Sequence, residues 1–322
     1  WRDDVQAEVD LFEEVAKSIG YAEMPETLPA LPPSDTKAHQ LLPSFMNLRT
    51  ILSGAGADEI MTYSFVSKKD LEYSLSDESK CLQIENPLSS EQDYLRTNMM
   101  ASHLRVAEKN YQIKQSAGVY EIARVYEKTG KSAAESWKLS ILVWGDDSLL
   151  RLKGLIDVVL GSYGTDFDVR RDLNCKLFVP NRSAVIGGGI GRFGQVNPVI
   201  LSNFDIQNEV AWAEIDLQEL QLSIQPKKIV EPIPYQLIKK DLSVELESLV
   251  TYYELREKLR GLVAKVDFKS EFTNDELKSK SLKRLTVSLT MDLGPNPKGE
   301  EIKELLDKCS LKALELPKAK VL

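Results

Sequence analysis

Cysteine and histidine are scarce in this sequence. The three cysteines, Cys81, Cys175 and Cys309, lie far apart and form no C-x-x-C pair. This pattern favours small core residues in a reducing compartment over a disulfide framework. The two histidines, His39 and His103, are too few for a histidine-rich zinc site or a readily assembled Ser-His-Asp triad. We therefore expect a protein without a bound metal.

Long apolar runs are also missing. No segment approaches the roughly 18 apolar residues of a membrane helix, so we expect a soluble, cytoplasmic protein with no membrane partner. Hydrophobic residues make up 43% and charged residues 28% of the 322 residues, which excludes a disordered or fibrous chain and suggests about two domains.

A strong basic excess is absent as well. The net charge is -8, with 24 Lys and Arg against 33 Asp and Glu in residues 1–228 and 17 against 16 in residues 229–322. An acidic chain is not a general nucleic-acid binder. The nearly neutral C-terminal part is nevertheless compatible with contact to RNA.

Periodicity and turn residues divide the chain into parts. Four prolines between Met24 and Ser34 predict an extended linker. Beyond it, the spacing of apolar residues predicts helices at 42–52, 99–113 and 149–160 and strands at 60–65, 119–126, 139–144 and 211–217.

The C-terminal part begins after Pro232 to Tyr235. Apolar residues alternate at 242–246 and 285–291 and follow helical spacing at 252–263 and 302–309. With further strands at 265–268 and at the C-terminus, the order is β-α-β-β-α-β, which predicts a ferredoxin-like domain. The tail from Leu314 to Leu322 is either an RNA contact or a solvated edge strand protected by its lysines.

A glycine-rich segment, Gly189-Ile190-Gly191-Arg192-Phe193-Gly194-Gln195-Val196, matches G-x-G-x-x-G. A dinucleotide fingerprint must open a helix, whereas Val196, Pro198 and Ile200 follow here. We expect residues 187–194 to form a turn between strands, with no helix N-terminus behind it and no bound nucleotide. The alternative is an independent ATP-using enzyme served by this loop.

Several motifs occur in a fixed order. They are Asn86-Pro87-Leu88-Ser89, Leu95-Arg96-Thr97, Glu121-Ile122-Ala123-Arg124-Val125-Tyr126, Phe178 to Ala184 and Gly191 to Pro198. Together they resemble the β subunit of bacterial phenylalanyl-tRNA synthetases, with Asn181 and Asn197 where Gly and His are usual. The resemblance implies an α+β fold: a class II aminoacyl-tRNA synthetase-like antiparallel sheet with helices, followed by the ferredoxin-like domain.

The same resemblance implies that this core is non-catalytic. Class II synthetases carry an arginine for the ATP α-phosphate in a strand that here ends at Glu127, and a carboxylate repels that anion. Lys128 lacks the planar fork of arginine, and we expect Arg96 and Arg124 to be structural. No catalytic residue is therefore assigned and no cofactor is expected on this chain, while ATP and magnesium would serve a catalytic α subunit within an α2β2 heterotetramer.

A subunit contact is implied by similarity to motif 1 of class II synthetases, a helix and strand at the subunit interface. The matching residues here are Phe45, Leu48, Ile51 and Tyr63.

An anticodon contact is implied by the C-terminal domain of the same family. Asp267 in "V-D-F-K" and Ser281 in "K-S-L" match residues that read the first anticodon base of tRNA(Phe), and their hydrogen-bonding groups suit guanine. A stacking aromatic of the family is Lys269 here. Phosphate contacts are expected from Lys239, Lys240, Lys280 and Lys283. The alternative is a surface acid and a strand-start serine in an assembly module without RNA contact.

The chain begins at Trp1 without a methionine, and an amphipathic helix with Val9, Phe12 and Ile19 on one side follows. We expect a C-terminal fragment that lacks the family's OB-fold and editing modules. Its expected parts are residues 1–36, the end of a preceding module and linker; 37–228, the synthetase-like core; and 229–322, the anticodon-binding domain.

Overall fold

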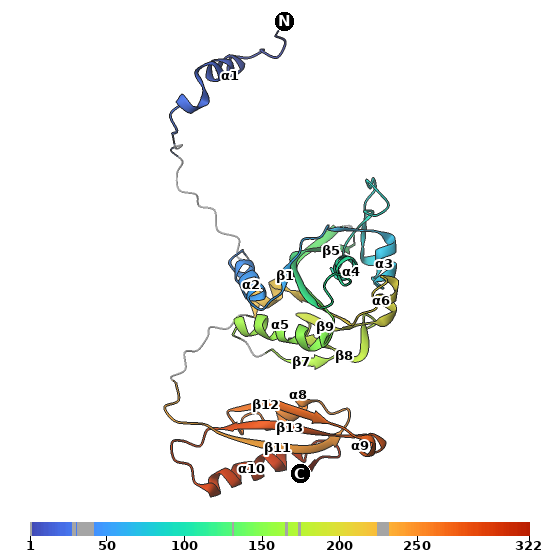
Figure 1. The fold of residues 1–322 in the computed structure, drawn as a ribbon, viewed down its shortest axis with the longest axis vertical. Coiled ribbons are helices and arrows are strands. Elements are labelled where there is room, and N and C mark those ends of the chain that lie inside the picture. Colours follow the sequence, from blue (N-terminus) through green and yellow to red (C-terminus); the bar gives the residue numbers. More distant parts are fainter. Residues whose placement is uncertain are drawn as a thin grey trace. The chain divides into compact units, whose positions relative to one another are not determined.

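The computed structural model describes residues 2–27, 30, 42–130, 132–164, 167–172, 175–223 and 232–322. Its internal contacts group Trp1–Leu42 and Pro43–Leu322 into two units, which are described separately (Figure 1). Most of the predicted linker and His39 lie outside the described residues.

The first unit contains one α-helix, α1 (Glu8–Ile19), followed by a 3-10 turn at Tyr21–Glu23. The carboxylate of Asp10 accepts hydrogen bonds from the backbone N–H of Gln6 and Ala7 at 2.8 and 2.7 Å, which fixes the start of the helix. Gly20, with φ of 98°, ends it. The expected amphipathic helix is present, and its apolar side chains are exposed within this unit.

The second unit is an α+β structure built on a seven-stranded sheet with the order β1-β5-β6-β10-β9-β8-β7. The β1–β5 pair is parallel and the other pairs are antiparallel. In sheet order the strands are Asp58–Glu59, Ala117–Thr129, Ser132–Trp144, Val210–Asp216, Gly191–Val196, Phe178–Ile186 and Val169–Arg171.

Helices cover both faces of this sheet. On one face, α4 (Met100–Asn110) lies within the curve of the sheet (Figure 1), where Leu104 packs in one cluster with Leu142 and Trp212. On the other, α5 (Ser148–Ser162) packs against β6 and β10. Further helices are α2 (Leu42–Gly54), α6 (Pro198–Asn203) and α7 (Leu217–Leu222).

The strand predicted at 60–65 is not continuous. Only β1 and the two-residue strand β2 (Phe65–Val66) form, and β2 joins β4 (Tyr94–Leu95) and β3 (Leu82–Gln83) in a small sheet, beside α3 (Lys68–Tyr73) and a 3-10 turn at Glu78–Lys80. The reason is local: the N–H and the hydroxyl of Thr62 both donate to the Glu121 carboxylate, at 3.1 and 2.7 Å. The alternation of apolar and polar residues cannot predict that a side chain takes the place of a backbone partner.

The C-terminal part forms a second sheet with the order β12-β13-β11-β14, in which neighbouring strands are antiparallel. The predicted alternation of strands and helices is present, with one addition, the short helix α9 between β12 and β13. The elements are β11 (Ile238–Glu247), α8 (Tyr252–Leu259), β12 (Lys265–Phe272), α9 (Asp275–Ser279), β13 (Leu282–Met291), α10 (Gly299–Ala313) and β14 (Lys320–Val321). The tail thus ends in an edge strand.

This second sheet has its own core, in which alternate residues of β11 and β13, such as Val244 and Val287, pack with Leu255 of α8 and Cys309 of α10. Cys81 and Cys309 are buried, as predicted, and Cys175 is half-buried. Across the described residues, none of the helices is both long and apolar enough to span a membrane.

Candidate functional site

A buried charged cluster links α4 to the large sheet. Arg96, His103 and Glu121 are 1%, 0% and 3% exposed. The guanidinium Nη2 of Arg96 lies 3.2 Å from Oε1 of Glu121, and Nε2 of His103 lies 3.2 Å from Oε2 of the same carboxylate. Because Arg96 follows β4, Glu121 lies on β5 and His103 on α4, the cluster joins three elements.

Hydrogen bonds extend this cluster and satisfy it. Arg96 donates to the Thr62 hydroxyl at 2.7 Å and to the Arg124 carbonyl at 3.3 Å. On the other side, the Trp212 indole N–H donates to the Ser140 hydroxyl at 2.8 Å, and that hydroxyl lies 3.3 Å from Nδ1 of His103.

Electrostatics fix the protonation of this network. Burial lowers the pKa of His103, so the ring is neutral. Burial also raises the pKa of Glu121, but the hydrogen bond with His103 and the charge of Arg96 outweigh it and set the value at about 2. A neutral His103 then donates from Nε2 to the Glu121 carboxylate and accepts at Nδ1 from Ser140. The polar groups satisfy one another, and the network holds α4 on the sheet.

A second acid contacts the start of α4. Oε2 of Glu214, on β10, accepts a hydrogen bond from the N–H of Met99, the residue before the helix, at 2.9 Å. Burial raises the pKa of Glu214 to about 7, although the Met99 N–H and the charge of Lys138 lower it. A carboxylate at a helix N-terminus interacts favourably with the positive end of the helix dipole.

The position at which the resemblance implies a phosphate-binding arginine holds a paired acid, Glu127. Glu127 is half-exposed and forms an ion pair with Lys80 at 3.0 Å. Arg124 is bound to Glu135 at 3.0 Å and lies over the Trp137 ring at 4.9 Å. Both arginines expected to be structural therefore have protein partners here, and we assign no chemical step to this part of the fold.

The glycine-rich segment is a turn followed by a strand. Gly187, Gly188 and Gly189 have positive φ and connect β8 to β9, while Gly191 and Gly194 lie within β9. The predicted turn is confirmed for residues 187–190. The absence of a following helix was a wrong prediction: α6 begins at Pro198, because Asn197 caps it through a 3.0 Å bond to Val199 N–H and proline suits the first helical position.

That helix does not convert the segment into a dinucleotide site. The whole of β9 separates the glycine turn from α6, whereas the fingerprint requires the glycines to open the helix directly.

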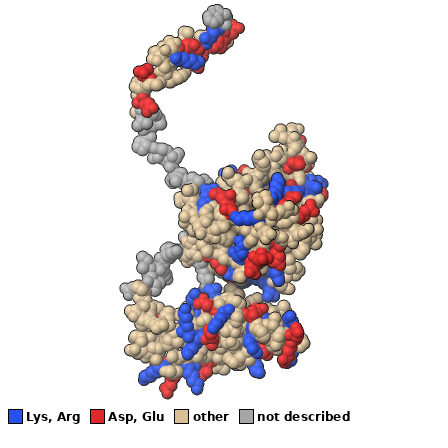
Figure 2. Space-filling view, viewed as in Figure 1, with Lys and Arg blue, Asp and Glu red and all other residues tan. Residues whose placement is uncertain are grey.

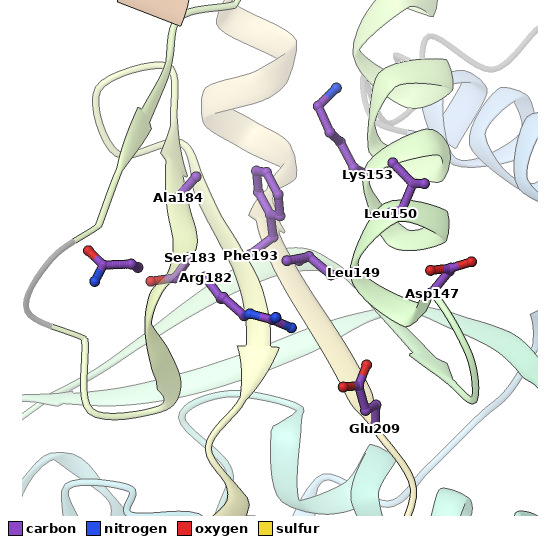
Figure 3. Close-up of a pocket in the computed structure, with 10 residues that line it drawn as sticks. Asp147, Leu149, Leu150, Lys153, Arg182, Ser183, Ala184, Phe193 and Glu209 are labelled. Carbon is purple, nitrogen blue, oxygen red and sulfur yellow. The ribbon is translucent and has the colours of Figure 1, made fainter. Parts of the chain in front are cut away.

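The last four residues of the Phe178 to Ala184 motif, 181–184, line a cavity of about 410 Å³ between α5 and strands β8 and β9 (Figure 3). Phe193 and Leu149 form apolar walls, and the Arg182 guanidinium extends into the space, where it donates to Gln195 at 2.5 Å. The Ser183 hydroxyl donates to the Asp172 carbonyl at 2.8 Å. Since none of the lining residues is a histidine, this serine has no histidine base among them.

The residues expected to contact another subunit differ in solvent exposure. Phe45 and Leu48 are 4% and 0% exposed, and the Phe45 ring packs on Trp137 at 4.9 Å. Ile51 is half-buried, whereas Tyr63 is 75% exposed. Most of the apolar face of α2 thus packs in its own fold, and Tyr63 is the accessible member of the set.

The expected anticodon residues lie at two ends of the C-terminal sheet. Asp267 on β12 is paired with Ser288 of β13, seven residues along the chain from Ser281. At about 3.3 Å per residue, the two are roughly 23 Å apart, too far for both to contact one base. Lys239, paired with Thr290, and its neighbour Lys240 lie at the Asp267 end; Lys280 and Lys283 lie at the Ser281 end.

The lysines expected to bind phosphates differ in access. Lys239 and Lys240 are exposed. Lys280 is exposed and bound to Glu276 at 2.7 Å. Lys283 is only 8% exposed and bound to Glu271 at 3.0 Å. This burial argues against the predicted phosphate contact of Lys283, because its side chain points to the same face as the buried Leu285.

Sequence reasoning missed an aromatic residue at the Ser281 end. Phe272 is 49% exposed and is paired with Arg284, whose guanidinium lies 5.8 Å from the ring centre. Nε of Arg284 is buried without a hydrogen-bond partner among the described residues. A register shift between Phe268 and Ser270 hides this pairing from a simple reading of the sequence. Figure 2 shows basic and acidic side chains interspersed over the visible face of the C-terminal part.

Within the part of the chain that the structure describes, no group of three His, Cys, Asp or Glu side chains is arranged to hold a metal ion.

Comparison with known proteins gives one family. Residues 24–217 match the family model described as phenylalanyl tRNA synthetase beta chain CLM domain. The phenylalanine–tRNA ligase beta subunit of Dehalococcoides mccartyi is 30% identical over 272 residues, covering 78% of this chain and 33% of the relative. That of Streptococcus pneumoniae is 27% identical, covering 99% of this chain and 43% of the relative.

The chain thus spans less than half the length of these curated relatives. Among solved structures, the pyrrolysyl-tRNA synthetase of Desulfitobacterium hafniense is similar, with a TM-score of 0.49 and 14% identity over 57% of this chain and 68% of that one.

Proposed function

The chain belongs to the phenylalanyl-tRNA synthetase beta-chain family, and from this membership we propose that it is a non-catalytic part of phenylalanine–tRNA ligase. The observation that carries the proposal is the closed network of Arg96, Glu121 and His103. Its charges are used to hold α4 on the sheet and are inaccessible to a substrate.

The proposed architecture follows the family. Residues 37–228 form a class II synthetase-like core and residues 229–322 a ferredoxin-like, anticodon-binding domain, with 1–36 as the end of a preceding module and linker. The two separate cores, around Trp212 and around Val287, support this division.

The proposed enzyme couples phenylalanine to tRNA(Phe) with ATP and magnesium bound on an α subunit, within an α2β2 assembly in the cytoplasm. The pairing of Glu127 with Lys80, where an arginine would bind the α-phosphate, supports placing this chemistry on the partner chain.

The proposed RNA contact uses the open face of the C-terminal sheet. One base stacks at the Ser281 end, where the half-exposed Phe272 ring supplies the aromatic surface. Asp267, about 23 Å away by strand register, contacts a different nucleotide of the same loop.

The test is binding of tRNA(Phe) to the chain in complex with its α subunit, with guanine or adenine at the first anticodon position. We expect Ser281→Ala to reduce the guanine preference by about 1 to 3 kcal/mol, and Phe272→Ala and Asp267→Ala to weaken both tRNAs alike. If only Asp267→Ala lost the guanine preference, the contact to the first anticodon base would lie at the Asp267 end of the sheet instead. Equal binding of tRNA(Phe) and unrelated RNA in every variant would favour an assembly module without RNA contact.

A further inference from the structure

A polar cavity lies at the C-terminal end of α8, at the Asp267 end of the second sheet. Its volume is about 410 Å³. Three of its lining residues are cationic, Arg256, Arg260 and Lys265, and one is acidic, Asp267. We call it the α8 cavity; its other lining residues are Tyr252, Gly261, Val263, Ala264 and Val266.

One wall of the α8 cavity is fixed. The Tyr252 hydroxyl donates to the Val266 carbonyl at 2.7 Å, and the ring packs edge-on against Phe268 with centroids 5.7 Å apart. Burial and the charge of Asp267 raise the pKa of this hydroxyl, whereas the charges of Arg256 and Lys265 lower it; all three charged residues line the cavity with Tyr252. Phe268 itself is 53% exposed beside the cavity.

Two cations at the rim, Arg260 and Lys265, form ion pairs with partly exposed acids. Arg260 lies 3.3 Å from Glu257 and Lys265 lies 2.7 Å from Asp267, with Arg260 and Lys265 side chains 64% and 67% exposed. Exposed pairs of this kind contribute about 0 to 1 kcal/mol. A phosphate, which accepts several charge-assisted hydrogen bonds at once, can therefore replace these carboxylates as the partner.

Because the cavity lies at the C-terminal end of α8, an anion binds there only if positive side chains attract it. The C-terminal end of a helix carries partial negative charge and disfavours an anion. Attraction for an anion at the end of α8 must come from Arg256, Arg260 and Lys265 together, and the lining supplies two more positive than negative side chains.

We propose that the α8 cavity binds a phosphate group of the RNA backbone. The inference rests on the proposed RNA contact and deepens it. A phosphate held there lies at the edge of β12 and places its nucleotide beside the Asp267 carboxylate, at the end of the sheet that also carries Lys239 and Lys240. The cavity thereby fixes where the RNA strand crosses the sheet, without reading its sequence.

The experiment measures tRNA(Phe) binding to the α-subunit complex across a series of salt concentrations. The variant is Arg260→Gln with Lys265→Gln; the control is Lys303→Gln with Lys308→Gln, which removes the same charge from α10 outside the cavity. We expect the cavity variant to bind about tenfold more weakly, with the slope of log K against log[salt] smaller by about 0.7 per lost single-strand phosphate contact. Unchanged affinity and slope in the control are expected.

Equal losses in the two variants would overturn the cavity assignment while leaving the RNA contact standing. Absence of tRNA binding by the unsubstituted complex would overturn the proposed RNA contact and the cavity assignment with it. Calorimetric titration with inorganic phosphate distinguishes free phosphate from RNA phosphate as the occupant of the cavity. If the cavity variant loses millimolar phosphate binding but keeps the salt dependence of tRNA binding, the cavity binds free phosphate, which would contradict our proposal.

Discussion

At the scale of single residues, two acids act on the same helix, and their pKa values move in opposite directions. Glu121 is ionised because His103 and Arg96 lie against it, whereas burial of the half-buried Glu214 raises its pKa to about 7 despite the Met99 N–H and the charge of Lys138. Both carboxylates help to position α4, one through His103 and the other through the Met99 N–H.

Glu214 predicts a pH dependence of stability. Its folded pKa of about 7 lies above the ordinary value of 4.5, so the folded state binds more protons than the unfolded state between these values. The stabilisation is complete below pH 4.5 and is lost as the pH rises to 7, by about 3 kcal/mol in total. Glu214→Gln keeps an oxygen for the Met99 N–H but does not titrate.

The measurement is the free energy of unfolding of both proteins by urea at pH 5, 6, 7 and 8. The substituted chain should match the original near pH 5 and exceed it at pH 8. A constant difference at every pH would show that Glu214 does not titrate in this range.

At the scale of elements, the position of most helices and strands follows from periodicity in the sequence, since burial imposes that periodicity. The polar network does not follow, because Arg96, His103 and Glu121 are separated in sequence and fit no repeating pattern. The signal available was a charged residue, Glu121, inside the otherwise apolar run of β5. The same network explains why the strand predicted at 60–65 is not continuous: the N–H of Thr62 donates to the side chain of Glu121 instead of to a strand backbone.

Strand β9 packs closely at Gly194, where a side chain would clash with its neighbours. A Cβ added to Gly194 would lie 2.7 Å from Phe178 and Ser183 side-chain atoms and 2.8 Å from the Arg182 carbonyl. We expect Gly194→Ala to destabilise the fold by about 1 to 3 kcal/mol in urea unfolding. The control, Gly154→Ala in α5, has open space and should stabilise by up to about 1 kcal/mol. Equal effects would contradict the packing seen at β9.

At the scale of the whole molecule, the chain matches less than half of its relatives' length, and its proposed activity depends on a partner. The residues expected to contact the anticodon show the limit of a sequence motif. The resemblance implies Asp267 and Ser281 as a pair, but the distance between them depends on the pairing of β12 with β13, which no local pattern determines.

Subunit association is predicted to depend on Tyr63. Because this side chain is 75% exposed, Tyr63→Asp should leave the fold intact and weaken binding to the α subunit by about 1 to 2 kcal/mol. Ile113→Asp, a change at another exposed apolar residue, should have no effect. Analytical ultracentrifugation of each mixture measures the difference, and equal affinities of the two variants would place the interface elsewhere.

We propose that this chain carries no activation chemistry of its own, because the family resemblance implies an anion-binding arginine where Glu127 stands, and because the charges of Arg96 and Glu121 are buried and paired with each other. Phenylalanine-dependent exchange of pyrophosphate into ATP measures that chemistry most directly. We predict background exchange with the purified chain alone and strong exchange once a matching α subunit is added. Exchange above background that follows the chain through purification, without any α subunit, would contradict the account.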